Sequence, residues 1–272
     1  MPPPTPEVEA ARFVPGAAHT LAPSGGKARF DANVAAIRLA RELAAEDRAT
    51  TVPEQEVLAQ WSSWGAIPDV FDSAKPEWEA ERGELRSLLS ETEWAAAART
   101  TLNAHYTDPM LVKHIWRALS SLGLDSGQVL EPGSGLGTFV GLAPDAAQVT
   151  GVELDPVTAL ISQRLYPHAT IRNESFADTR IPEAFFDAAV GNVPFGKTTL
   201  LDPVHNATKQ SMHNHFIIKS LRLTRPGGLV SVLTSQFTMD ARNPGARREM
   251  NSLADLVGAI RLPRRTHSRT AG

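Results

Sequence analysis

After residue 102 the chain alternates short apolar runs with segments of helical pattern, and this alternation constrains the fold more than any other feature. Alternation of this kind is typical of an open parallel sheet with helices on both faces, an α/β fold. Ligands of such sheets bind at the carboxyl ends of the strands. Six runs are expected to form the strands: Val129–Leu130, Val149–Val152, Ala169–Ile171, Phe186–Val190, Leu229–Leu233 and Leu256–Ile260.

The first hundred residues have a different pattern. Residues 1–26 mix Pro, Gly, Ala and Thr without periodicity and are expected to form a loose arm. Apolar residues then recur at three- and four-residue steps over 30–46, which predicts an amphipathic helix. Residues 54–64 and 77–90 have a similar amphipathic pattern. We therefore predict a helical region over 1–100 that precedes an α/β domain over 101–272.

A further helix is predicted to begin near residue 90, because Ser90 and Glu93 have the spacing of a capping box. Four of the five tryptophans lie in the helical region, and we expect them to pack against the following domain. They are Trp61, Trp64, Trp78 and Trp94.

Composition excludes several classes of protein. The chain has 272 residues, no Cys and a formal net charge of −3, so disulfide frameworks, thiolate zinc sites and cysteine nucleophiles are excluded. No apolar run approaches the roughly 18 residues that a membrane span requires, and we expect a cytoplasmic protein without a membrane partner. Residues 241–272 carry 7 Lys/Arg against 2 Asp/Glu. These arginines are suited either to a phosphate backbone or to a solvated face.

A glycine-rich loop follows the first predicted strand. Gly133, Gly135 and Gly137 alternate with other residues after Glu131, and such glycines let the backbone turn tightly and approach a ligand. The next strand ends at Glu153, roughly 20 residues further on, where a carboxylate holds the hydroxyls of a ribose in nucleotide-binding folds. The pair of motifs predicts a nucleotide-like cofactor.

Two cofactor classes share this layout, dinucleotides and S-adenosylmethionine (SAM). Glu131 favours SAM, because a carboxylate attracts the cationic aminoacyl end of SAM and repels a pyrophosphate. After the third strand, the segment Glu174–Asp178 offers an aromatic wall and a carboxylate, which could hold an adenine ring and its exocyclic amine.

The candidate catalytic segment is Asn192-Val193-Pro194-Phe195, directly after the fourth strand. The side-chain carbonyl of Asn192 and the main-chain carbonyl of Val193 can accept the two hydrogens of an exocyclic amine and localise its lone pair. Phe195 offers a flat face on which a base, flipped out of a duplex, can stack. Methyl transfer at such a site depends on positioning and electrostatics.

Over residues 101–262 the chain resembles the N6-adenine DNA methyltransferases of the class I SAM-dependent superfamily. Asn192–Phe195 is similar to their Asn-Pro-Pro-aromatic signature and departs from it at Val193. The resemblance implies a Rossmann-like sheet and methylation of adenine in DNA. The residues that it implies for SAM binding are Tyr106, Thr107, Glu131, Gly133, Gly135, Glu153 and Asp178.

The helical region resembles the N-terminal extension of methyltransferase modules in large phage- and plasmid-borne methylase–helicase proteins. This implies DNA as a partner and a helicase region beside the methyltransferase. A complete class I core has seven strands, yet one predicted strand, Leu256–Ile260, follows the fifth. The sheet is therefore expected to lack its last strand, so that the chain is a fragment or is completed by a partner.

Other interpretations of the function remain open from the sequence. The same tetrapeptide is suited to a glutamine amide in protein or an amine in RNA. A further alternative is a catalytically silent SAM-binding or interaction module of a larger protein. No metal site is predicted, because His213 and His215 are two residues apart and would lie on different faces of a helix, without a suitably spaced carboxylate.

Overall fold

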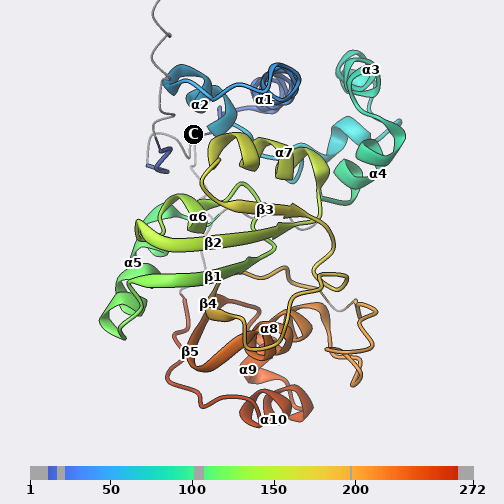
Figure 1. Cartoon of the computed structure of the whole chain (residues 1–272). Coiled ribbons are helices and arrows are strands. Elements are labelled where there is room, and N and C mark those ends of the chain that lie inside the picture. Colours follow the sequence, from blue (N-terminus) through green and yellow to red (C-terminus); the bar gives the residue numbers. More distant parts are fainter. Residues whose placement is uncertain (1–11, 17–21, 101–106, 197, 263–272) are drawn as a thin grey trace, which may run out of the picture.

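The computed structural model describes residues 12–16, 22–100, 107–196 and 198–262. Within them, five parallel strands form one sheet in the order β3-β2-β1-β4-β5 (Figure 1). The order reverses beside β1, the position at which open α/β sheets bind ligands. The strands are β1 (Ser126–Pro132), β2 (Ala146–Glu153), β3 (Thr170–Asn173), β4 (Phe186–Asn192) and β5 (Thr224–Leu233).

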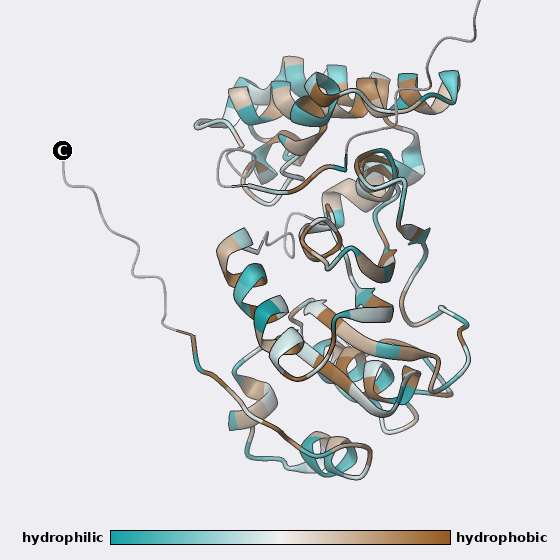
Figure 2. Cartoon of the chain, turned by 60° about the vertical axis from the view of Figure 1, so that its left-hand side comes forward, coloured by the Kyte–Doolittle hydropathy of each residue, from teal (hydrophilic) through white to brown (hydrophobic). Residues whose placement is uncertain are grey.

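The predicted α/β Rossmann-like sheet is confirmed, with five of the six predicted strands. The prediction of a strand at Leu256–Ile260 is wrong, because these residues have no strand structure. A strand is held by pairing with a neighbour, and in the described residues β5 pairs only with β4. The segment instead runs as an extended trace (Figure 2) and exposes its apolar side chains, including Ile260 at 90%.

Helices cover both faces of the sheet. Val129 belongs to a hydrophobic cluster shared with α5, α6 and α7, whereas its neighbour Leu130 belongs to a second cluster shared with α8. This alternation places successive β1 side chains on opposite faces, as strand geometry requires. The helices are α5 (Pro109–Ser121), α6 (Thr138–Gly141), α7 (Pro156–Leu165), α8 (Met212–Leu223), α9 (Phe237–Asp240) and α10 (Gly245–Asn251).

The predicted helical region packs on α7 (Figure 1). The indole nitrogen of Trp61 donates to Thr158 Oγ1 at 3.1 Å, and Thr50 Oγ1 donates to the carbonyl of Arg164 at 2.8 Å. The elements of this region are α1 (Gly26–Glu46), α2 (Val52–Ala59), η1 (Pro68–Phe71), η2 (Pro76–Trp78), α3 (Glu79–Leu88) and α4 (Glu91–Thr100).

The four tryptophans of this region are buried, as expected. Trp64 contacts Trp61 edge-on, with ring centroids 5.7 Å apart, and Phe71 in the same manner at 5.6 Å. These rings belong to the same hydrophobic cluster as the α7 face of the sheet. The helical region and one face of the sheet therefore share one core, while the domain boundary predicted at residue 100 adjoins residues outside the described part.

A local sequence motif also gives the predicted start of one helix. Ser90 and Glu93 form the predicted capping box: the amide of Ser90 donates to Glu93 Oε2 at 2.8 Å, and the amide of Glu93 donates to Ser90 Oγ at 3.3 Å. The loose-arm prediction fails for residues 12–16. Phe13 is buried against Tyr166, with ring centroids 5.9 Å apart, because its apolar ring is covered more favourably there than in water.

The shared core predicts that the helical region and the sheet unfold together. Replacing Trp64, which is 1% exposed, with Ala should lower the free energy of unfolding by about 3–5 kcal/mol in a single urea transition. Leu122→Ala, at a position that is 57% exposed, is the control. A separate early transition in Trp64→Ala would show that the two parts unfold independently.

Candidate functional site

The loop after β1 has the conformation that only glycine adopts readily. Gly133, Gly135 and Gly137 have φ angles of +69°, +54° and +87°, in the left-handed region. At Gly137 a Cβ atom would lie 2.7 Å from the ring of Tyr166, so no side chain fits. At Gly135 the same position is open space. The loop thus packs against α7 at one end and leaves its backbone accessible at Gly135.

Glu153, the last residue of β2, is bonded to this loop. Its Oε2 accepts a hydrogen bond from the amide of Gly135 at 2.8 Å, and its Oε1 accepts one from the amide of Asp155 at 2.8 Å. Burial raises the pKa of Glu153 to about 7, against the effect of these hydrogen bonds. Each carboxylate oxygen retains a second lone pair, so the group can still accept bonds from a diol.

Glu131 lies at the end of β1 and is 2% exposed. Its Oε2 is buried without a hydrogen-bond partner, and burial raises its pKa well above the ordinary value. A buried, unpaired carboxyl is costly unless a cation or donor satisfies it. Glu131 is therefore suited to hold a cationic ligand group.

One pocket of about 370 Å³ brings most of the predicted site together. Its walls come from the loops after β1, β2, β3 and β4, which meet because parallel strands end at the same edge of the sheet. The predicted residues that line it are Thr107, Glu131, Gly133, Gly135, Glu153, Glu174, Phe176, Asn192, Val193, Pro194 and Phe195.

Asn192 is held with its amide oriented. Its Nδ2 donates to Thr107 Oγ1 at 3.2 Å, whereas its Oδ1 is buried without a partner. The Asn192 oxygen is thus an acceptor that no group of the described chain satisfies. A polar ligand hydrogen placed there would complete its bonding.

The rest of the tetrapeptide is fixed by its neighbours. The amide of Val193 donates to the carbonyl of Leu233 at 3.1 Å, and the Val193 side chain is buried. Pro194 faces the glycine loop, since its Cδ would lie 3.5 Å from a Cβ at Gly133. Phe195 is 42% exposed and lines the pocket. The turn therefore presents an acceptor, Asn192, and a flat ring at one place.

Two predicted site residues do not join this group. Tyr106 lies outside the described residues. Asp178 is exposed and does not line the pocket, because the backbone around it is turned inward: buried Lys219 binds the carbonyls of Ala177 and Thr179. Glu174, paired with Arg172 at 2.7 Å, is the carboxyl that this loop contributes to the pocket.

The structure adds pocket residues that the sequence did not indicate. Ser63, Ala96 and Arg99 of the helical region line the pocket, and so do Met212 and Phe216 of α8. Nothing near Ser63 or Ala96 in the sequence has the form of a motif, because their role follows from the packing of the helical region on α7. The left-handed backbone of Ser63, with φ of +55°, is visible only in the structure.

His213 and His215 have partners within the protein. His215 is fully buried, and its Nε2 is 3.1 Å from Asp202 Oδ2, while His213 Nδ1 lies 3.3 Å from the carbonyl of Gly196. Among the described residues, no group of three or more His, Asp or Glu side chains is arranged to hold a metal ion.

The arginines of residues 241–272, which the sequence suits either to a phosphate backbone or to a solvated face, differ in their surroundings. The guanidinium of Arg247 donates to the carbonyls of Thr238 and Ala241 and so braces the turn before α10, while Arg242 and Arg248 are exposed. The others, Arg264, Arg265 and Arg269, lie outside the described residues. In the part of the chain that the structure covers, no helix has the length and apolar character to span a membrane.

Comparison with known proteins gives structural neighbours alone. No protein-family model and no curated protein matches the sequence. A proposed class I SAM-dependent methyltransferase from Listeria monocytogenes is 12% identical, with a TM-score of 0.47 over 82% of this chain and 78% of that one. A proposed RNA methyltransferase from Pyrococcus horikoshii is 14% identical, with a TM-score of 0.37 over 55% and 68%.

A third neighbour is a proposed sarcosine dimethylglycine methyltransferase from Galdieria sulphuraria, 13% identical, with a TM-score of 0.37 over 45% of this chain. The match spans 46% of that protein's length. Because one fold supports many activities, we infer the chemistry of this chain from the side chains of its own pocket.

The raised pKa of Glu153 predicts a pH dependence of stability. A folded-state pKa of about 7, above the ordinary value of 4.5, means that the stabilising contribution of Glu153 is complete below the ordinary value and is lost as the pH rises from there through about 7. The free energy of unfolding of the wild type, relative to Glu153→Gln, should therefore fall over this interval in urea titrations. Glu79→Gln, an exposed carboxyl on α3, is the control, and parallel curves for wild type and Glu153→Gln would contradict the assignment.

Proposed function

We propose that this chain is a SAM-dependent methyltransferase whose acceptor is the exocyclic N6 amine of adenine in DNA. The observation that supports this most directly is the unsatisfied Asn192 Oδ1, which lies in the same pocket as Glu131 and Glu153. Cofactor-binding groups and an amine acceptor thus share one cavity.

The pocket has the chemical groups that SAM requires. Glu131, whose buried Oε2 has no hydrogen-bond partner, matches the ammonium of the methionine end. Glu153 matches the ribose hydroxyls, and Phe176, 3% exposed, offers a ring face to the adenine. The open space beside Gly135 allows the ligand to approach the backbone. An ammonium next to Glu131 would also offset the cost of burying that carboxylate.

When bound, SAM supplies a sulfonium methyl group, and its transfer leaves a neutral thioether. Asn192 Oδ1, with the main-chain carbonyl of Val193, accepts the amine hydrogens and raises electron density on the nitrogen. SAM held by Glu131 and Glu153 would supply its methyl group to that nitrogen, the electron pair of the broken carbon–sulfur bond would stay on sulfur, and the amine would release one proton to solvent. Phe195 holds the base by stacking, and the chain contributes chiefly position.

The tetrapeptide and the basic residues of the chain support DNA as the proposed substrate. A base in a duplex reaches such a pocket only when it is flipped out, and exposed Phe195 is available to receive it. Exposed Arg242 and Arg248 are suited to the phosphate backbone. The resemblance to methylase–helicase proteins supports a partner helicase region, and the basic residues of the last 32 positions support DNA as the polyanion.

Calorimetric titration with SAM tests cofactor binding. We expect saturable binding to the full chain, and Glu153→Ala should weaken it by about tenfold or more, since a hydrogen bond to a charged group contributes about 1.5–3 kcal/mol. Asp178→Ala is the matched control, an acidic residue of the neighbouring loop that lies outside the pocket, and should change the affinity little. A folded chain that does not bind SAM would exclude the methyltransferase. It would favour an interaction module without catalytic activity.

Labelled methyl transfer to adenine-containing DNA, to RNA and to protein tests the acceptor. We expect N6-methyladenine in DNA by mass spectrometry. Asn192→Ala should reduce the rate by about 100-fold or more, as when one transition-state hydrogen bond is removed, while SAM affinity stays near that of the wild type. Label in RNA or in a glutamine amide instead would reassign the substrate, and unchanged activity of Asn192→Ala would reject this tetrapeptide as the catalytic segment.

A further inference from the structure

Lys219 of α8 is a charged side chain in the interior of the protein, with 0% exposure. Its Nζ donates to the carbonyl of Phe176 at 2.6 Å and to those of Ala177 and Thr179 at 3.2 Å each. It also donates to Asp202 Oδ2 at 2.9 Å. One ammonium group therefore binds the loop after β3 and the segment after the catalytic turn at the same time.

Asp202 organises the second of these segments. Its side chain is fully buried, and its Oδ1 accepts hydrogen bonds from the amides of Val204 and His205 at 3.2 and 3.1 Å. Its Oδ2 lies 3.1 Å from His215 Nε2. Although burial acts in the opposite direction, the hydrogen bonds from Lys219, His205 and His215 hold the pKa of Asp202 below its ordinary value.

Both segments bound by Lys219 contribute to the pocket. Phe176 lines the pocket and packs against Phe216, with ring centroids 4.8 Å apart. Leu200, two residues before Asp202, lines it from the other segment. The adjacent Leu201 is 85% exposed. Movement of either segment would therefore displace a wall of the pocket.

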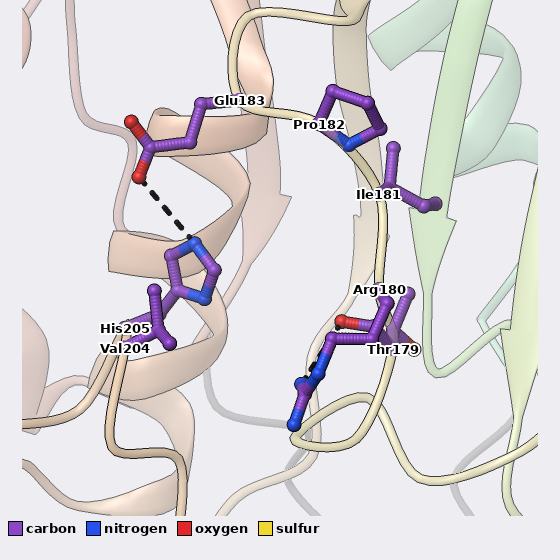
Figure 3. A pocket seen from close by; sticks show the side chains of 7 residues that line it. All are labelled: Thr179, Arg180, Ile181, Pro182, Glu183, Val204 and His205. Carbon is purple, nitrogen blue, oxygen red and sulfur yellow. Dashed lines mark hydrogen bonds and ion pairs between the residues drawn. The ribbon is translucent and has the colours of Figure 1, made fainter.

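On the outer side the two segments are less closely joined. A hollow of about 470 Å³ lies between Thr179–Glu183 and Val204–His205. Figure 3 shows the side chains that line it. Across this hollow Glu183 and His205 face each other, with Oε1 and Nε2 3.5 Å apart. Because the hollow separates the segments there, the buried bonds of Lys219 are the close connection between them.

We propose that Lys219 and Asp202 are positioning residues that couple the Phe176 wall of the cofactor pocket to the segment following the catalytic turn. Phe176 and Asp202 are 26 positions apart in the sequence, and neither segment has regular structure to fix it. A buried ion pair is often no more stable than an apolar substitute, so this pair is better explained by the position that it imposes. The role for the pocket rests on the proposed function, whereas the coupling of the two segments does not.

Hydrogen exchange in the full chain without ligand tests the coupling directly. In Lys219→Met, which keeps most of the length of the side chain and removes its donors, exchange should accelerate by about tenfold or more in both 174–180 and 200–206, because the buried bonds that hold both segments are lost. The strands β1 and β2 should exchange as in the wild type. Lys113→Met on α5 is the control. Acceleration in one segment only, in neither, or equally throughout the sheet would overturn the proposal.

Asp202→Asn provides a second variant if Lys219→Met does not fold. It keeps the shape and the acceptor oxygen of the side chain while removing its charge. The same two segments should again lose protection together, to a smaller extent. Loss confined to 200–206 would mean that Asp202 organises its own segment without coupling to Phe176.

A double-mutant cycle on SAM affinity tests whether the coupling serves the pocket. Lys219→Met should weaken SAM binding by about tenfold in the wild-type background and by less than about threefold in Phe176→Leu, because residues that act through one another are not additive. Additive losses would overturn the role of Lys219 through Phe176. If the wild type itself does not bind SAM, the proposed function fails, and the exchange experiment still decides the coupling.

Discussion

Parallel strands deliver all of their carboxyl ends to one edge of the sheet, and every candidate functional group of this protein depends on that constraint. β1 ends in Glu131 and the glycine loop, β2 in Glu153, and β4 in Asn192. The hydrogen bond between Glu153 and Gly135 joins two of these ends. The shared direction of the strands thus brings residues from distant parts of the sequence into one cavity.

The helical region has a closer relation to the site than its position in the sequence indicates. Its tryptophans share a core with α7, and this packing brings Ser63 and Arg99 to the pocket. A region that resembles an accessory extension is therefore part of the wall. The pocket belongs to both the helical region and the sheet.

Sequence patterns predicted what short-range physics determines. The strands that are buried on both faces read as apolar runs, the glycine loop follows from φ angles that other residues avoid, and the Ser90–Glu93 cap is a contact between near neighbours. The wrong predictions concern contacts between segments that are far apart in the sequence. Leu256–Ile260 has the composition of a strand but no partner in the described chain, since pairing is a property of two segments.

Asp178 illustrates the same distinction at the scale of one side chain. Its place after β3 suggested a pocket carboxylate, yet the direction of its loop is set by Lys219, which lies 41 positions further on. The position of Ser63 in the pocket was not predicted either, because it also depends on contacts between distant segments. A sequence specifies which residues a loop contains more readily than which of them face inward.

The bond between Asn192 and Thr107 joins residues separated by 85 positions, and that between Trp61 and Thr158 spans 97. Closing such long loops costs chain entropy before the contacts return any energy, so topologies of this kind fold slowly. These contacts form only when distant segments have come together, so a ligand that binds the complete pocket stabilises the fully folded chain relative to partly folded forms.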